Sequence, residues 1–449
     1  MTKLQGHNAI GSASVEAFQR ASHVFVDGTT RVTIERDPIP RYADHGRGAY
    51  LVDLDGRHFL DLNANFTTLI HGHGFAPVVE AVTRQLASGA CFANPTLAEI
   101  DLAELICRRV PGADTIRFVS TGSEAIMFAI KAARAFTGRP AIAKIEGAYH
   151  GAYDWVEVSQ ASTPDNWGPK DSPARVPYYH GMPASVLDEV IALRFNDAAL
   201  AERLIAEQAD RLAAIVLDPM PSRAGLIAPT AEFIGAIQRA AARHGIVLIA
   251  DEVLNFRQGY QGASARHGLT PDLFTFGKII GGGLPIGAVA GGRDVMSVFD
   301  ASSGRPRLPQ GGTFSANPLS MVAGLASMQD LDEDAFAHLE AMGDQLRDCL
   351  RQAITRHGAP FSVSGAASLF RVHPKRHLPR DFREAIPSTT EASVMKELTR
   401  FFSEAGIILP YGAAACLSTP MTPGDIDLVA SAFDEFLTKR SDLIEGLAA

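Results

Sequence analysis

The middle of the chain alternates short apolar runs with longer segments of helical periodicity. The runs at 141–145, 213–217 and 246–250 are almost entirely apolar, as expected of strands that are buried on both faces of a parallel sheet. In the helical segments at 122–136 and 230–244 one face is apolar, and a glycine follows the second segment, where helices commonly end. Repeated strand–helix units predict an α/β fold with a mostly parallel central sheet and helices on both of its faces.

Both ends of the chain follow a different pattern. Residues 31–62 contain two alternating runs around Asp55-Gly56, which indicates a β-hairpin. After residue 330 a long helical segment at 332–357 precedes short strands and a final amphipathic segment at 425–439. We therefore expect the N- and C-terminal segments to form a smaller α+β domain. The expected division assigns 1–75 and 329–449 to the small domain and 76–328 to the large domain.

Composition and charge argue against several classes of protein. With 449 residues, 46% of them hydrophobic, the chain can bury a large core in more than one domain. A formal net charge of −9 without a basic run argues against a nucleic-acid partner. The apolar runs have the length of strands and the N-terminus lacks the pattern of a signal peptide, so we expect neither a membrane span nor export. Four cysteines without a CxxC pair favour free thiols in a cytoplasmic protein.

An acidic residue and a lysine each follow an apolar run. Asp251 directly follows the run at 246–250, and ligands of open α/β sheets bind at the carboxyl ends of the strands. Alone, Asp251 is more simply explained as a helix cap. Lys278, however, leaves the run at 273–276 into a glycine-rich turn at 277–283. Most lysines lie on the surface, but apolar flanks lower the pKa of an amine and favour the free form that attacks an aldehyde.

The two residues together match the needs of pyridoxal 5′-phosphate (PLP). A lysine amine forms a Schiff base with the cofactor aldehyde, which Lys278 could supply. A carboxylate keeps the pyridine nitrogen protonated so that the ring withdraws electrons, which is a role for Asp251. For the phosphate, the segment 120–124 reads Ser-Thr-Gly-Ser-Glu and opens a predicted helix, whose free N–H groups attract an anion. The same segment is also an ordinary capping sequence.

Five motifs, in their order and spacing, resemble those of the class III (fold type I) aminotransferases. They are STGSEA, GAYHG (147–151), IADEV (249–253), FGKIIGGGLPIGA (276–288) and GGTFSANPLS (311–320). The likeness covers most of the chain and is closest to the branch of glutamate-1-semialdehyde aminomutase and the β-amino-acid transaminases. It implies a fold type I PLP-transferase fold, PLP as cofactor on Lys278, and a homodimer with shared active sites.

The resemblance also implies individual roles around the cofactor. Lys278, Asp251 and Tyr149 would be catalytic, with Tyr149 stacked on one face of the ring and Val253 pressed on the other. Thr313 would reach the cofactor phosphate of the neighbouring subunit. Asp218 stands where these enzymes usually carry glutamate, which puts a direct hydrogen bond to the cofactor region in doubt. The remaining cofactor-binding residues are expected to be Thr121, Gly122, Ser123 and His150.

Four residues are candidates for the substrate pocket. Arg31 matches roughly the position of an arginine that grips the substrate carboxylate in this branch, although a surface arginine is equally compatible with the sequence. Asn65, Phe66 and Tyr411 resemble the pocket wall. Relatives often carry a second arginine before a segment like 417–427, but residues 409–416 contain none. We therefore expect a small apolar pocket at this place, and a substrate with at most one carboxylate.

The resulting hypothesis is a ping-pong transaminase that moves an amino group from a β-amino acid or related amine to a 2-oxo acid. Lys278 would act as the general base on the Cα proton. An aminomutase would use the same residues, and a PLP-binding protein without catalysis is a more distant alternative. We expect no metal, since His71 and His73 are more simply read as a polar turn. The basic segment 373–380 is expected to be a solvated loop.

Overall fold

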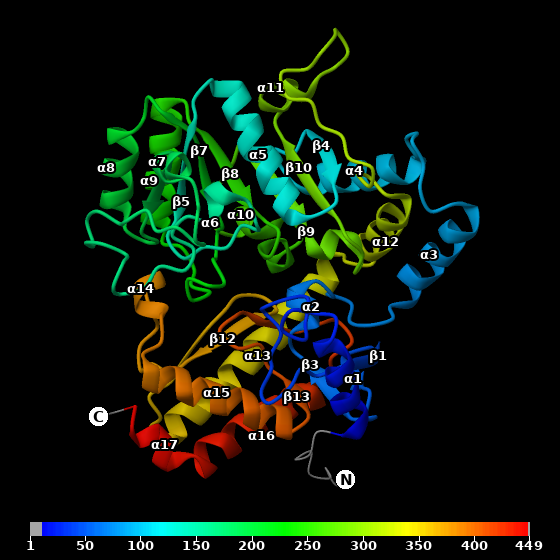
Figure 1. The fold of residues 1–449 in the computed structure, drawn as a ribbon, viewed down its shortest axis with the longest axis vertical. Helices are drawn as coiled ribbons and strands as arrows, with labels where there is room; N and C mark the ends of the chain where they lie inside the picture. Colours follow the sequence, from blue (N-terminus) through cyan, green and yellow to red (C-terminus); the bar gives the residue numbers. More distant parts are fainter. Residues whose placement is uncertain (1–10, 448–449) are drawn as a thin grey trace.

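A seven-stranded sheet lies at the centre of the larger part of the molecule (Figure 1). The computed structural model describes residues 11–447. Strand β10 runs antiparallel to both of its neighbours, while the pairs from β9 to β6 are parallel. In their order across the sheet, the strands are β4 (Thr115–Val119), β10 (Gly287–Gly291), β9 (Leu273–Gly277), β8 (Val247–Asp251), β7 (Leu212–Leu217), β5 (Ala141–Ile145) and β6 (Val190–Leu193).

The apolar runs of the sequence form the inner strands of this sheet. Every residue of β5, β7, β8, β9 and β10 is buried, because successive side chains point to opposite faces and both faces are covered. Val216 and Ile249 pack in one apolar cluster with α5 (Gly122–Thr137). Ile215 and Leu248 pack on the other side in the cluster of α9 (Ala231–His244). The predicted runs at 141–145, 213–217 and 246–250 are confirmed to within one residue at each end.

Further helices surround the sheet and its outer edge. Within residues 11–447, no helix combines the length and the apolar character needed to cross a bilayer. These elements are α3 (Ala76–Ser88), α4 (Leu97–Arg109), α6 (Asp154–Glu157), α7 (Ala184–Asp188), α8 (Ala198–Glu207), α10 (Gly262–Arg266), α11 (Arg293–Met296) and α12 (Pro318–Gln329), with the 3₁₀ turns η1 (Asn255–Gln258), η2 (Lys278–Gly281) and η3 (Ser297–Phe299).

The smaller part of the molecule combines both ends of the chain. The hairpin predicted around Asp55-Gly56 is formed by β2 (Tyr50–Asp53) and β3 (His58–Asp61). On its other side β3 pairs in parallel with β13 (Ile407–Ile408), so N- and C-terminal segments share one sheet. This is the expected α+β arrangement, while the boundaries at residues 75 and 328 remain our proposed division. The other strands are β1 (Ala43–Arg47), β11 (Ser362–Ser364), β12 (Leu369–His373) and β14 (Ala415–Cys416).

Helices cover the outer side of the smaller part, below the sheets in Figure 1. The segments predicted as helical at 332–357 and 425–439 form α13 (Glu333–His357) and α16 (Pro423–Lys439), which pack against each other. Each begins at a side chain that caps a free backbone amide, Asp332 in α13 and Thr422 in α16. The other helices are α1 (Ser12–Ser22), α2 (Ala64–Thr67), α14 (Phe382–Ala385), α15 (Thr389–Glu404) and α17 (Ser441–Glu445).

Arg257 of η1 joins the two parts from the inside. Its side chain is fully buried and donates hydrogen bonds to three neutral acceptors. These are the Ser368 hydroxyl at 3.0 Å, the Thr67 carbonyl at 2.8 Å and the Leu417 carbonyl. Hydrogen bonds from a charged donor are stronger than neutral ones, so Arg257 fixes the smaller part to the edge of the large sheet.

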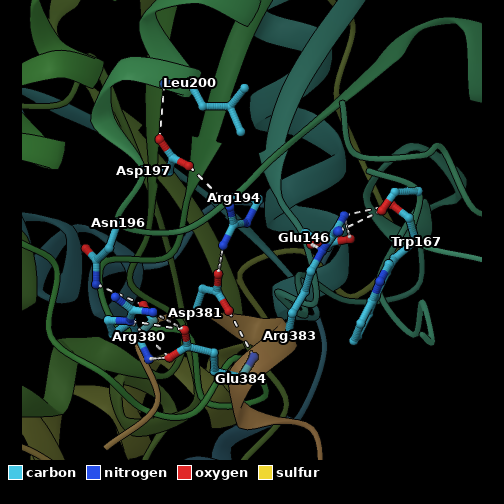
Figure 2. Close-up of polar contacts among 11 residues, drawn as sticks. Glu146, Trp167, Arg194, Asn196, Asp197, Leu200, Arg380, Asp381, Arg383 and Glu384 are labelled. Atoms are coloured by element: carbon cyan, nitrogen blue, oxygen red, sulfur yellow. Dashed lines mark hydrogen bonds and ion pairs between the residues drawn. The ribbon is translucent and has the colours of Figure 1, made fainter. Parts of the chain in front are cut away.

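Helix α14 makes a second junction, where two arginines pair with carboxylates across the two parts (Figure 2). Arg383 lies 2.8 Å from Glu146, both nearly inaccessible, and also donates to the Trp167 carbonyl. Arg194 of the large part pairs with Asp381 in front of α14. The expectation of a solvated loop at 373–380 is only partly right: residues 376–378 are exposed, whereas His373 and Pro374 are buried and Lys375 pairs with Glu391 at 2.7 Å.

Candidate active site

Lys278 lies where the buried strand β9 ends. It is the first residue of η2 and has a φ of 50°, in the left-handed region. Burial lowers the pKa of its amine to about 8, although the charges of Asp251 and Asp218 act in the opposite direction. No hydrogen bond or ion pair connects this amine to any residue in 11–447. Lys278 therefore carries an unpartnered amine that loses its proton more easily than an ordinary lysine.

A second buried lysine, Lys144 of β5, is placed differently. Burial lowers the pKa of Lys144 to about 7. Its side chain is fully enclosed, however, and the amine donates hydrogen bonds to the carbonyl oxygens of Ala148 at 3.3 Å and Val158 at 3.0 Å. The two lysines differ in their freedom to react: Lys144 satisfies buried carbonyl groups, whereas Lys278 stands unpartnered at the end of its strand.

Asp251 ends the neighbouring strand β8, and hydrogen bonds fix the orientation of its carboxylate. One carboxylate oxygen accepts from the Val253 amide at 3.0 Å and from the Thr275 hydroxyl at 3.2 Å. The other oxygen lies 2.7 Å from Nδ1 of His150. Burial lowers the pKa of His150, so the neutral ring donates its Nδ1–H to Asp251. The opposite ring atom, Nε2, is buried and has no partner among the described residues.

Asp218 follows strand β7 and lies in the same cluster. It is buried, and it accepts hydrogen bonds from the Met220 amide at 2.9 Å and from the Asn255 side chain. Burial and the negative charge of Asp251 raise the pKa of Asp218 well above its ordinary range. The Asp218 carboxyl group, near Lys278, therefore tends to keep its proton.

The N-terminus of α5 meets these residues at the same edge of the sheet. Thr121 caps the helix by accepting from the Glu124 amide at 3.1 Å. The amides of Gly122 and Ser123 have no acceptor within the helix, since they belong to its first turn. A Cβ atom on Gly122 would lie 2.9 Å from the Val253 side chain, so only glycine allows this approach. The segment 120–124 was expected to cradle a phosphate, and the free amides of Gly122 and Ser123 are donors for such an anion.

Tyr149 and its neighbours form the outer wall of the site. The ring of Tyr149 is half exposed, whereas the adjacent His150 is buried. Gly151 follows at a φ of 91°, where a Cβ would lie 2.3 Å from the Ser123 hydroxyl. This close contact brings the segment 147–151 against the start of α5. The structure thus gathers the residues expected around the cofactor, with the exception of Thr313, at one edge of the sheet.

These residues fit PLP in three respects. The Lys278 amine is free for the cofactor aldehyde, and the Asp251 carboxylate is oriented by three donors. The amides at the start of α5 are free for a phosphate. The glycines of the site also leave space that a Cβ would fill, as at Gly122 and Gly151. The unpartnered Nε2 of His150 is a further sign that the cluster is built around a ligand.

The residues expected around the substrate form two groups. Asn65, Phe66 and Arg31 lie at or near α2, whereas Tyr411 lies beside a cavity. Asn65 and Phe66 belong to α2, in which four successive residues have positive φ values between 45° and 70°. Such backbone is strained and needs support from its surroundings, here including the bond from Arg257 to the Thr67 carbonyl. Arg31 is exposed, and its guanidinium lies 5.8 Å from the centre of the Phe66 ring. The structure thus brings Arg31 and Phe66 together.

Thr313 and Tyr411 are both exposed. Thr313 makes no hydrogen bond to the other site residues within 11–447. Tyr411 borders a cavity of about 300 Å³ between the two parts of the molecule, which Arg223 and Arg371 also line. The expectation of a small apolar pocket is therefore only partly right: most of the lining side chains are apolar, but Arg223 and Arg371 reach the cavity from other segments. A signal did exist for Arg223, which follows strand β7 at the ligand-binding edge.

Comparison with known proteins agrees with this geometry. Residues 32–434 match the family described as aminotransferase class-III. Glutamate-1-semialdehyde 2,1-aminomutase 2 of Lysinibacillus sphaericus (strain C3-41) is 36% identical over 379 residues, which cover 84% of this chain and 85% of the relative. An omega-transaminase from Sphaerobacter thermophilus has a TM-score of 0.92 at 45% identity, covering 95% and 98% of the two chains. A β-phenylalanine aminotransferase from Variovorax paradoxus has a TM-score of 0.86 at 28% identity, covering 96% and 95%.

Proposed function

Since the chain belongs to the class III aminotransferase family and is thus a PLP-dependent aminotransferase, we propose that its donor is a β-amino acid or a related amine and its acceptor a 2-oxo acid. The observation that carries the amino-transfer chemistry is the unpartnered Lys278 amine near the Asp251 carboxylate, which is oriented by hydrogen bonds. The likeness to an omega-transaminase and to a β-phenylalanine aminotransferase supports the choice of donor.

Lys278 is assigned two tasks in this reaction. When bound, PLP supplies an electron-withdrawing ring that stabilises negative charge on the carbon next to the amine nitrogen. The Lys278 amine would hold the cofactor aldehyde until a substrate amine replaces it, and the freed amine would then take the Cα proton and deliver it to the former aldehyde carbon of the cofactor. A pKa of about 8 suits both tasks, because near neutral pH the amine can lose a proton and also regain one.

Asp251 and His150 are assigned to the ring nitrogen of the cofactor. The carboxylate of Asp251 stabilises a proton on that nitrogen. Its orientation is fixed by His150, whose Nδ1 lies 2.7 Å from one carboxylate oxygen, and by the Val253 amide on the other. We assign Val253 and Tyr149 to the two faces of the ring, and Asp218 to the support of this cluster rather than to direct proton transfer.

The phosphate is assigned to the start of α5 in one subunit and to Thr313 of its partner in a homodimer. Helix α3 supports such an assembly because it has no buried residue and leaves Val79 and Leu86 51% and 58% exposed. Other large apolar side chains close to α3 in the sequence are also exposed, and so is Phe314, which follows Thr313. Apolar surface of this kind commonly marks a protein interface. The exposed side chains in question are Val79, Leu86, Phe92, Leu97, Ile100 and Phe314.

An aminomutase is the second candidate, favoured by the name of the relative from Lysinibacillus sphaericus. It would use Lys278 and Asp251 in the same way but would return the amino group to the same molecule. The two candidate activities differ in their substrates, because a transaminase requires a separate acceptor and an aminomutase does not. A test with and without acceptor therefore separates them.

The experiment uses purified holoenzyme with 3-aminobutanoate as donor and pyruvate as acceptor. We expect alanine to form, and the kinetics to give parallel lines in double-reciprocal plots as in a ping-pong mechanism. The Lys278→Ala variant is the control and should form no alanine above background. Conversion of glutamate-1-semialdehyde without any acceptor, together with no alanine formation, would instead establish the aminomutase. Absence of any turnover with a bound cofactor would point to a binding protein.

A further inference from the structure

The cavity beside Tyr411 carries a strong positive charge. It holds about 300 Å³ and lies between the loop that contains Gln160 and the strand β12 with the segment 409–415. Arg223 and Arg371 both contribute to its lining, and no aspartate or glutamate does so among the described residues. Two guanidinium groups without a carboxylate make the cavity attractive to an anion.

The two arginines differ from the other arginines of this junction in lacking an acidic partner. Arg194 and Arg383 each pair with a buried carboxylate in Figure 2. Arg371 instead donates only to the Ser222 carbonyl at 2.6 Å, and Arg223 makes no hydrogen bond or ion pair with any residue in 11–447. Burial and the charge of Arg223 lower the pKa of Arg371 to about 10, so that Arg371 stays charged at neutral pH.

The walls of the cavity are held in place by the ion pairs of the second junction. Helix α14 and the residues that follow it, Ile386 and Pro387, form part of the lining. The pairs of Arg383 with Glu146 and of Arg194 with Asp381 fix this helix against the large part. The cavity is therefore a formed site in which α14 is held by ion pairs that lie outside the lining.

The cavity also borders the Lys278 site. Ala415 lines the cavity, and the next residue, Cys416, is close enough to Lys278 for each group to affect the pKa of the other. Burial raises the pKa of Tyr149, while the positive charge of Arg223 lowers it. An anion held between the two arginines would thus lie within electrostatic range of residues assigned to the cofactor.

We propose that Arg371 and Arg223 bind the carboxylate of the substrate, so that this chain selects amines that carry a carboxylate over amines that lack one. The inference rests on the proposed function and names its specificity residues. Arg371 offers a planar fork for two parallel hydrogen bonds, and Arg223 adds a second charge from the large part. A carboxylate would satisfy both guanidinium groups, which the protein itself leaves without an acidic partner.

The test compares two donors that differ in the carboxylate, 3-aminobutanoate and 2-aminobutane. Holoenzyme is mixed with donor alone, without an oxo acid, and the spectral change of the cofactor gives the rate of the first half-reaction. For Arg223→Gln and Arg371→Gln we expect the preference for 3-aminobutanoate to fall about 10- to 100-fold, as for loss of a charged hydrogen bond. Arg371→Lys should retain part of it, because the charge remains without the fork. Arg376→Gln is the matched control from an exposed position outside the cavity.

Binding of butanoate, an unreactive carboxylate, provides a second measurement by calorimetry. We expect its Kd to rise at least tenfold in Arg223→Gln, which removes no hydrogen bond within the described protein. An unchanged donor preference in both glutamine variants, or equal losses with both donors, would overturn the carboxylate assignment. If the wild type reacts with neither donor, the proposed function fails, and butanoate binding still decides whether the arginines recognise a carboxylate.

Discussion

Replacement of Lys278 by methionine is expected to stabilise the cofactor-free protein while it abolishes activity. The fall of the Lys278 pKa from 10.5 to about 8 corresponds to about 3–4 kcal/mol at about 1.4 kcal/mol per pKa unit. This is the free-energy cost of keeping a charged amine in its buried position. Methionine has a similar length and no charge, so the variant avoids this cost. A reactive residue thus lowers stability at the place where it acts.

The difference in the free energy of unfolding between Lys278→Met and the wild type depends on pH. In the unfolded chain the amine keeps its proton up to about pH 10.5, whereas in the folded protein it loses the proton above about pH 8. Between these values the unfolded state binds more protons, so the stability of the wild type rises with pH. The advantage of Lys278→Met should therefore be complete well below pH 8, at about 3–4 kcal/mol, and should become small near pH 10.5.

Urea unfolding of the two cofactor-free proteins at a series of pH values measures this difference. Lys170→Met is the matched control, since Lys170 is exposed, and it should change the free energy of unfolding by less than about 0.5 kcal/mol. The reasoning is refuted if Lys278→Met gains nothing at pH 7, or if its gain is the same at pH 7 and pH 10.5. Either result would mean that burial does not disfavour the charged amine.

Three further predictions concern packing and assembly. Gly151→Ala should lower the free energy of unfolding by roughly 1–3 kcal/mol, because the new Cβ would meet a neighbouring side chain. It should also lower the affinity for PLP in a cofactor titration. Gly56→Ala, which is also at positive φ but in open space, should leave the PLP affinity unchanged. Leu86→Glu should shift the protein towards the monomer in sedimentation velocity, whereas Leu378→Glu, at another exposed apolar position, should not. Arg257→Met should lower the free energy of unfolding in urea by about 3–5 kcal/mol, since it leaves three buried acceptors without their donor. A loss below about 1 kcal/mol would contradict the role given to this arginine.

The inner strands and the central pair of residues could be predicted from local sequence. A strand covered on both faces must be apolar throughout, and the sheet edge at the strand ends is where ligands bind. Asp251 ends one such strand and Lys278 directly follows the neighbouring one, so the two residues approach each other because the strands are adjacent. The structure agrees with that expectation. It also shows that His150, which was expected at the cofactor, contacts Asp251, a residue 101 positions away in the sequence.

The remaining parts of the site depend on contacts that no local pattern encodes. The cavity arginines Arg223 and Arg371 are 148 positions apart and meet only because the two parts of the molecule pack together. The left-handed turn α2 contains no glycine, so its backbone is fixed by tertiary contacts such as that from Arg257. Helix α14 is too short to be recognised by periodicity, and its ion pairs with the large part are long-range.

The assignment of Lys278 as the residue that holds the cofactor is tested most directly by borohydride reduction of the purified holoenzyme. Reduction converts the linkage between the cofactor aldehyde and a lysine amine into a stable bond, and mass spectrometry of the peptides locates it. We predict one modified lysine, Lys278, and no modification of Lys144, whose amine is engaged with two carbonyl groups. A cofactor bound to Lys144 or to any other lysine, or to none, would contradict the account.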